Sequence, residues 1–344
     1  MSIITILGIV GLVVCVSIKD TQKNRKIICI LLCLFFILQA GLRDYEHATN
    51  DTYNYLRSYK LLLPISLSDV LESLAFKFNL DDYTMRDPGY TLFVKLTQII
   101  CPDFRFFLIV VATIISIPLV WIIYKFTNSL MGIAIASMIY EALFAGFFET
   151  GIRQTIAMGL IYFSLPFVIK RKWVPHYLML IIAYFMHSSA LIFIPFYPLT
   201  VIKTSRKFLT WAIILTPVFM MSASTIVAHI GSGTMFESYA TTTIDNKGTP
   251  VFSALLFIVS IGAWIFRKRF SENDVLDRML ITSIVCSLLL MPTTWVNSNF
   301  IRLVFYYLVF LMPLVPRIIS FIASNYTERA WMSIAVGIVL IILS

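Results

Sequence analysis

Apolar stretches long enough to cross a lipid bilayer recur along the whole chain, and they constrain its fold more than any other feature. The chain has 344 residues, of which 59% are hydrophobic and 13% are charged, whereas a soluble domain is about one-quarter charged. In hydrocarbon, such stretches satisfy their backbone amides as helices. The sequence therefore predicts an all-α, polytopic integral membrane protein, with residues 1–344 in a single membrane domain.

We expect about ten full transmembrane helices. They cover residues 3–18, 27–41, 104–124, 130–148, 152–169, 208–228, 251–266, 279–292, 301–316 and 330–344. Residues 88–101 are too short to span and carry Lys95, which favours an interfacial helix on the outer side. Residues 175–200 have basic residues on both flanks, which favours a re-entrant pair of half-length helices that meet near His187.

The distribution of charge predicts an N-terminus outside the cell. With this orientation, the cytoplasmic loops hold a large excess of Lys and Arg, which accounts for the net charge of +9. A rival topology, in which 88–101 and 175–200 each cross once, would expose the basic cluster Lys170 to Lys172 outside. The predicted outer face carries two larger extracytoplasmic loops, residues 42–87 and 229–250. Because the basic residues are dispersed between spans, we expect no nucleic-acid partner.

Two arginines are candidate ligands of a phosphate or pyrophosphate group. Arg153 and Arg302 each follow an outer corner and open a predicted helix, where exposed amides and the helix dipole favour an anion. The planar guanidinium can bind two phosphate oxygens at once. The alternative is that each arginine reaches the lipid headgroups or pairs with Glu149 or Asp51.

The first outer loop combines carboxylates with aromatic residues, as a sugar site does. It contains the run Arg43-Asp44-Tyr45-Glu46-His47, followed by Asp51, Tyr53 and Tyr55. Tyr53 and Tyr55 are candidate sugar-binding residues, because rings stack on apolar sugar faces, and a carboxylate can accept the proton of an acceptor hydroxyl. A solvated loop or a divalent-cation site is the alternative. The ligand spacing is weak, so we predict no metal and no cofactor.

His187 is a further candidate catalytic residue. It is predicted to lie mid-membrane beside Ser188 and Ser189, where a histidine is costly unless it is hydrogen-bonded or functional. The alternative is that it holds the broken helix together through backbone carbonyls. The sequence has no Walker A loop, G-x-G-x-x-G, H-E-x-x-H or G-x-S-x-G motif, which favours a substrate with its own leaving group, such as a lipid pyrophosphate.

Several short motifs resemble the EpsG-type branch of the Wzy exopolysaccharide and O-antigen polymerases. The similarity covers roughly residues 40 to 310. It lies in Arg43, Asp51-Thr52-Tyr53-Asn54-Tyr55, Asp87-Pro88-Gly89-Tyr90, Gly151-Ile152-Arg153-Gln154-Thr155-Ile156-Ala157, Lys170-Arg171-Lys172, His187-Ser188-Ser189-Ala190-Leu191 and Asn299-Phe300-Ile301-Arg302 with Tyr306. This sequence departs from the family pattern at Asp87, where glutamate is usual, and at Thr49-Asn50-Asp51, where Gly-Thr-Asp is expected.

The resemblance implies a multi-pass glycosyltransferase of the bacterial cytoplasmic (inner) membrane whose active site faces the periplasm or the exterior. Such an enzyme transfers a growing glycan from undecaprenyl pyrophosphate to a lipid-linked repeat unit. The implied partners are the undecaprenyl pyrophosphate-linked oligosaccharide and membrane lipid, with a chain-length regulator protein as a further candidate. The implied pyrophosphate and sugar contacts are Arg43, Asp51, Arg153, His187 and Arg302.

We therefore predict a polysaccharide polymerase in which arginines neutralise the departing pyrophosphate. A carboxylate, Asp51 first and Asp44 or Asp87 next, positions or deprotonates the acceptor hydroxyl. An O-antigen-type ligase shares the donor and is the nearest rival. A lipid-linked oligosaccharide flippase or other transporter, and a membrane acyltransferase, are rivals from other classes.

Overall fold

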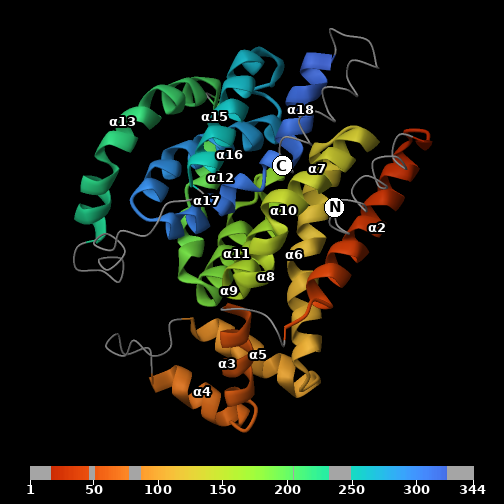
Figure 1. Ribbon diagram of the computed structural model, residues 1–344, viewed down its shortest axis with the longest axis vertical. Coiled ribbons are helices and arrows are strands. Elements are labelled where there is room, and N and C mark those ends of the chain that lie inside the picture. Colours follow the sequence, from red (N-terminus) through yellow and green to blue (C-terminus); the bar gives the residue numbers. More distant parts are fainter. Residues whose placement is uncertain (1–16, 46–50, 77–86, 204, 232–248, 324–344) are drawn as a thin grey trace. The chain divides into compact units, whose positions relative to one another are not determined.

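The computed structural model describes residues 17–45, 51–76, 87–203, 205–231 and 249–323, and within these ranges the chain forms helices and no strand (Figure 1). It divides into two compact units, Met1–Ile194 (unit 1) and Pro195–Ser344 (unit 2). Each unit is described by itself. The single membrane domain expected from the sequence stays a prediction.

Among the described residues, five helical segments are long and apolar enough to cross a membrane, as the composition predicts. They are Gln22–Gly41, Phe104–Phe126, Ile152–Ile169, Arg206–Thr225 and Val275–Trp295. A sixth candidate is the pair Ser298–Leu308 and Leu311–Ala323, which is bent by 63°. Pro313 lies near the start of the second helix of this pair. Because proline has no backbone N–H, it cannot donate to a carbonyl one turn earlier, which explains the break between the two helices.

The expected count of ten spans is not confirmed. The first and last expected spans, 3–18 and 330–344, lie outside the described residues, as does most of the second outer loop, 229–250. The expected span 130–148 breaks at Phe144 into α7 (Leu130–Leu143) and α8 (Ala145–Thr150). The expected span 251–266 is the 17-residue helix α15 (Thr249–Ile265).

Unit 1 is built around α6 (Phe104–Phe126), which packs against α2 (Gln22–Gly41) and α9 (Ile152–Phe163) (Figure 1). Helix α9 continues into the short α10 (Leu165–Ile169) and packs against α11 (Trp173–Met186). Helix α5 (Pro88–Ile100) contacts α4 (Leu67–Phe76), α6 and α11. These contacts bring the starts of α5 and α9 and the end of α11 together.

The stretch 88–101 forms the 13-residue helix α5, and Lys95 on it is buried instead of reaching an interface. Its ammonium donates to the carbonyls of Leu62 and Leu63 at 3.3 and 3.2 Å, at the end of α3 (Asp51–Leu62). A cation at a helix C-terminus binds orphan carbonyls and complements the helix dipole. Gln98 also donates to the carbonyl of Tyr59 at 2.8 Å. Lys95 therefore fixes α3 on α5, which the sequence reading did not anticipate.

The stretch 175–200 breaks where the sequence predicts. Helix α11 ends at Met186, His187 is extended with φ −161°, and the 3-10 helix η1 (Ser188–Phe193) follows. The next helix, α12 (Phe196–Val201), belongs to unit 2, so the re-entrant course stays a prediction.

Unit 2 centres on α16 (Val275–Leu290), which packs against α12, α13 and α17. The other elements are α13 (Ser205–Gly231), α15, η2 (Arg267–Arg269), η3 (Met291–Trp295), η4 (Ser298–Phe300), α17 (Ile301–Leu308) and α18 (Leu311–Ala323). Buried Arg278 donates to the Thr200 carbonyl at 2.8 Å, and Asp277 pairs with Arg317 at 2.7 Å.

Candidate functional site

A buried carboxylate, Asp87, lies where α5, α9 and the α11–η1 break meet. Asp87 precedes Pro88 at the N-terminus of α5, a sequence that favours a helix start. Its side chain makes no capping bond to α5 and is 1% exposed. It binds other helices instead: Oδ2 accepts from Arg153 Nη1 at 3.1 Å and lies 3.4 Å from His187 Nδ1. Oδ1 accepts from the Ser188 N–H at 3.4 Å.

Helix ends place the Arg153 guanidinium and the His187 imidazole beside this carboxylate. Arg153 is the second residue of α9, which starts after Gly151, as predicted. His187 is the C-cap of α11, and its N–H donates to the Ala183 carbonyl at 2.9 Å. A buried carboxylate is stable only with such partners. Asp87 therefore holds together two residues predicted to act on the substrate.

Two tyrosine rings flank the Arg153 guanidinium. Its carbon lies 5.0 Å from the ring centre of Tyr90 and 5.8 Å from that of Tyr55. The two rings meet edge to face at 6.0 Å. Aromatic faces attract a guanidinium electrostatically and hold its plane. Tyr55 was expected to bind sugar, whereas Tyr90 was not singled out.

The environment keeps Asp87 ionised. Burial by itself raises the pKa of Asp87, but the hydrogen bond and charge of His187, followed by those of Arg153, lower it below its ordinary value. A carboxylate with a lowered pKa is a poor proton acceptor at neutral pH. The geometry thus favours a role for Asp87 in positioning Arg153 and His187, whereas the sequence had suggested that it positions or deprotonates the acceptor hydroxyl.

Arg153 retains hydrogen-bonding capacity after it pairs with Asp87. A guanidinium has five N–H donors, and the bond to Asp87 involves Nη1. Its Nε is buried and has no partner among the described residues. The side chain is 34% exposed. Arg153 can therefore bind a further anion at the start of α9, where the helix dipole also favours negative charge. Its observed partner is Asp87, instead of Glu149 or Asp51.

Arg43 lies in a different set of contacts. It donates from Nη1 to the Ala40 carbonyl at 2.6 Å and from Nη2 to the Glu149 carbonyl at 2.7 Å. Burial lowers the pKa of Arg43, and the nearby charge of Glu149 opposes this. Arg105 donates to the Arg43 carbonyl at 2.5 Å. Arg43 thus ties the end of α2 to the end of α8.

The remaining predicted residues lie on helix starts or on the surface. Asp51 is the half-buried first residue of α3, and Asp44 is exposed after α2. Arg302 is the exposed second residue of α17 in unit 2, so its expected position at a helix start is confirmed. Glu46 and His47 lie outside the described residues. Across the part of the chain that the structure describes, no group of three His, Cys, Asp or Glu residues could hold a metal ion.

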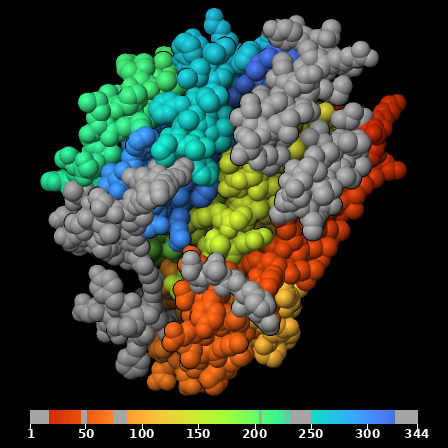
Figure 2. Space-filling model, viewed as in Figure 1, coloured from red at the N-terminus to blue at the C-terminus, as the bar shows by residue number. Residues whose placement is uncertain are grey.

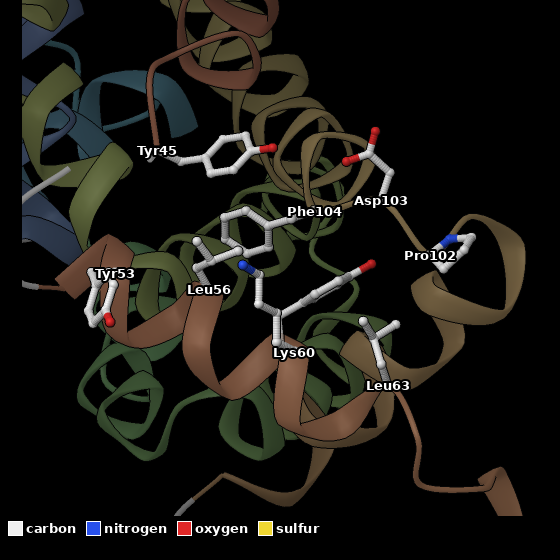
Figure 3. A pocket seen from close by; sticks show the side chains of 9 residues that line it. Tyr45, Tyr53, Leu56, Lys60, Leu63, Pro102, Asp103 and Phe104 are labelled. Carbon is white, nitrogen blue, oxygen red and sulfur yellow. The ribbon is translucent and has the colours of Figure 1, made fainter. Parts of the chain in front are cut away.

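A pocket of about 470 Å³ opens beside α3 in unit 1 (Figure 3). Tyr53, the other expected sugar-binding residue, lies on its wall and is 55% exposed. Figure 2 shows the residues of α3 and α4 on the surface of unit 1. The pocket is lined by Tyr45, Tyr53, Leu56, Tyr59, Lys60, Leu63, Pro102, Asp103 and Phe104.

Sequence reasoning found Asp87, Arg153 and His187 individually but missed their pairing. Asp87 is 66 positions from Arg153 and 100 positions from His187. No local sequence pattern predicts a contact between residues so far apart. Tyr90 could have been found, because it follows Asp87 in the run Asp87-Pro88-Gly89-Tyr90.

Comparison with known families gives one match. The model of the EpsG family matches residues 26–344, a range that includes Asp87, Arg153, His187 and Arg302. Comparison with curated proteins and with solved structures gives no match.

Proposed function

The chain belongs to the EpsG family, and we propose that it is a membrane glycosyltransferase that polymerises a lipid-linked polysaccharide on the extracytoplasmic face of the bacterial cytoplasmic membrane. The donor is a growing glycan on undecaprenyl pyrophosphate, and the acceptor is a lipid-linked repeat unit. The long apolar helices support a membrane location, since the substrates are themselves anchored in lipid.

The observation that carries the proposal is the joint contact of Asp87 with Arg153 and His187. It holds a guanidinium, which can bind an anion, and an imidazole, which can accept a proton, against one buried carboxylate. Glycosyl transfer from a pyrophosphate needs both, because negative charge grows on the leaving group while the acceptor hydroxyl loses a proton.

Arg153 acts on the leaving group in this proposal. As the bond between the anomeric carbon and the pyrophosphate oxygen breaks, the oxygen keeps the electron pair. Guanidinium donors and the amides at the start of α9 stabilise this charge more in the transition state than in the bound substrate. Arg302, at the matching position of α17, is proposed as a second ligand of the same group. For Arg43, the two carbonyl bonds support a positioning role.

His187 acts on the acceptor. When Nδ1 carries the hydrogen directed at Asp87, Nε2 is left to accept a proton. The acceptor hydroxyl gives its proton to Nε2, its oxygen bonds the anomeric carbon, and the proton later leaves to water. Asp44 and Asp51 are proposed to position the acceptor through its other hydroxyls.

Purified protein supplied with lipid-linked repeat units tests the proposal against its rivals. A polymerase gives a ladder of products that differ by one repeat. A ligase gives one transferred product on another acceptor, and a transporter forms no new bond. Arg57→Ala, at an exposed position of α3, serves as the matched active control, and Asp87→Asn as the inactive one. The absence of any ladder from folded wild-type protein contradicts the proposal.

A further inference from the structure

Two faces of helix α3 contact different parts of unit 1. One face directs Tyr55 to Arg153 of the candidate site. On the other, Tyr53, Leu56 and Lys60 recur at i, i+3 and i+7, Leu63 follows directly after the helix, and all four line the pocket. Residues with this spacing lie on one side of a helix. The same helix therefore serves both the candidate site and the pocket.

Packed aromatic rings form a rigid part of the pocket wall. Phe104 meets Tyr45 edge to face at 5.1 Å and Tyr59 at 5.2 Å. The Arg105 guanidinium lies 4.6 Å from the ring centre of Tyr45 and fixes that ring from another side. Tyr53, by contrast, offers a largely exposed ring at the edge (Figure 3).

Polar groups of opposite charge line different walls of the pocket. Lys60 comes from α3, and Asp103 from the corner before α6 (Figure 3). Asp103 Oδ1 accepts from the Arg105 N–H at 2.8 Å, which orients the carboxylate. A volume of about 470 Å³ lies within the range of about 300–1,000 Å³ that is usual for small-molecule pockets.

We propose that this pocket is a saccharide subsite that binds a sugar ring of the glycan away from the reacting carbon. A pyranose has apolar faces that stack on tyrosine rings and a rim of hydroxyls that both donate and accept. Lys60 donates to such hydroxyls, and Asp103 accepts from them. A lipid tail would offer no hydrogen bond to Lys60 or Asp103, and a phosphate would be repelled by Asp103. The assignment rests on the proposed function for its choice of glycan.

Binding can be measured without turnover. The probe is the reducing oligosaccharide released by mild acid from the lipid-linked repeat units of the expressing strain, added to full-length protein in nanodiscs. Saturation-transfer NMR is expected to show contact with sugar ring protons for the wild type and for Arg57→Ala. Tyr53→Ala should weaken binding about tenfold, since it removes a stacking ring. Lys60→Ala should also weaken binding.

Conservative variants separate binding from folding. Tyr53→Phe keeps the ring and should bind within about twofold of the wild type. Asp103→Asn keeps the cap of α6 but loses the charge, and it should weaken binding without changing the melting temperature. Equal binding by Tyr53→Ala and the wild type overturns the pocket assignment, as does a ladder-forming wild type that binds no oligosaccharide. Protein that binds in a Tyr53-dependent way yet makes no ladder overturns the proposed function and leaves the subsite standing.

Discussion

Arg153 Nη1 donates to Asp87 Oδ2 at 3.1 Å, and this bond joins the start of α9 to the start of α5. The carboxylate is buried, whereas the arginine keeps part of its side chain exposed. The pair therefore joins two helices, and its arginine can be reached from the surface while its carboxylate cannot. Removing either partner should affect folding and activity to different extents.

Asp87→Asn should lower the free energy of unfolding by about 1–2 kcal/mol, because Arg153 loses a charged partner that solvent screens in part. A double-mutant cycle with Arg153→Gln should show a coupling of similar size. Thermal unfolding in detergent measures both. Asp103→Asn, at an exposed helix start, should change stability little. Additive effects of the two mutations at the pair would show that the contact contributes nothing.

The same pair predicts the pH dependence of stability. The pKa of Asp87 is lower in the folded chain than its ordinary value of 3.8. Its stabilisation is therefore complete above the unfolded pKa and is lost as the pH falls through the lowered folded pKa. The difference in melting temperature between the wild type and Asp87→Asn should be constant from about pH 5 to 7 and shrink below about pH 4. A difference that grows at low pH would contradict the assignment.

His187→Asn distinguishes a base from a structural histidine. Asparagine can still donate to Asp87 but has no nitrogen that accepts a proton. If His187 is the base, chain growth should slow by about 10²–10⁴-fold with little change in melting temperature. A structural role predicts near-normal ladders instead. The control is His229→Asn, at an exposed position near the end of α13.

Gly89→Ala tests the close approach of α5 and α11. A Cβ at Gly89 would lie 2.8 Å from Phe185 Cβ and 2.9 Å from its carbonyl oxygen, so the two helices must separate. The shift would move Asp87 away from His187. We expect activity to fall at least tenfold and stability to drop by about 1–3 kcal/mol.

Gly146→Ala is the matched control, because a Cβ there meets nothing within 4 Å. It should leave ladders and melting temperature unchanged. If both glycine variants behave like the wild type, the α5–α11 contact is not needed to hold the site.

The sequence predicted the helices well where a single physical requirement decides them. Long apolar runs must be helical in lipid, so α2, α6 and α16 fall within or close to their expected ranges. Interruptions were harder to predict. The break at Phe144 and the 63° bend before α18 depend on side-chain packing. They also depend on where the fold tolerates the loss of a backbone hydrogen bond within a helix.

The candidate site was predictable as a set of residue types but not as an arrangement. Arg153 stood out because it opens a helix after an outer corner, where an anion is favoured. His187 stood out because a histidine in mid-membrane is costly. Asp87 was one of three carboxylates expected to position or deprotonate the acceptor hydroxyl, and its contacts with Arg153 and His187 were not anticipated. Lys95 was assigned to an interface, but the carbonyls at the end of α3 bind it. Each outcome depends on a partner distant in sequence.

The orientation of the first outer loop can be tested by labelling. On a cysteine-free background, cysteines at Ser58 and Ser238 should react with a membrane-impermeant maleimide on intact cells, and one at Ser271 should not. Ser58 and Ser271 are exposed at the surface of their units, and Ser238 lies outside the described residues. If the cysteine at Ser271 were labelled and the one at Ser58 were not, the predicted orientation would be wrong. The candidate sugar-binding residues would then not face the outside of the cell.

The proposed action of Arg153 and Arg302 on the pyrophosphate can be tested with alanine variants. Each is the second residue of its helix. If both bind phosphate oxygens whose charge grows as the glycosidic bond breaks, their loss should raise the barrier more than it weakens substrate binding. Arg153→Ala and Arg302→Ala should then abolish chains longer than one repeat in protein that still inserts. Arg267→Ala is the control, at a half-buried arginine of η2 that donates to the Trp264 carbonyl at 2.8 Å.

Lysine variants separate phosphate binding from a simple headgroup contact. Lysine keeps the charge but loses the planar fork, so Arg153→Lys and Arg302→Lys should remain about 1–3 kcal/mol short of wild-type transition-state stabilisation. A headgroup accepts either cation, so a headgroup contact predicts full activity for lysine. Chain-length ladders normalised to membrane protein level measure the difference. Wild-type ladders from both alanine variants would exclude the two arginines from the mechanism.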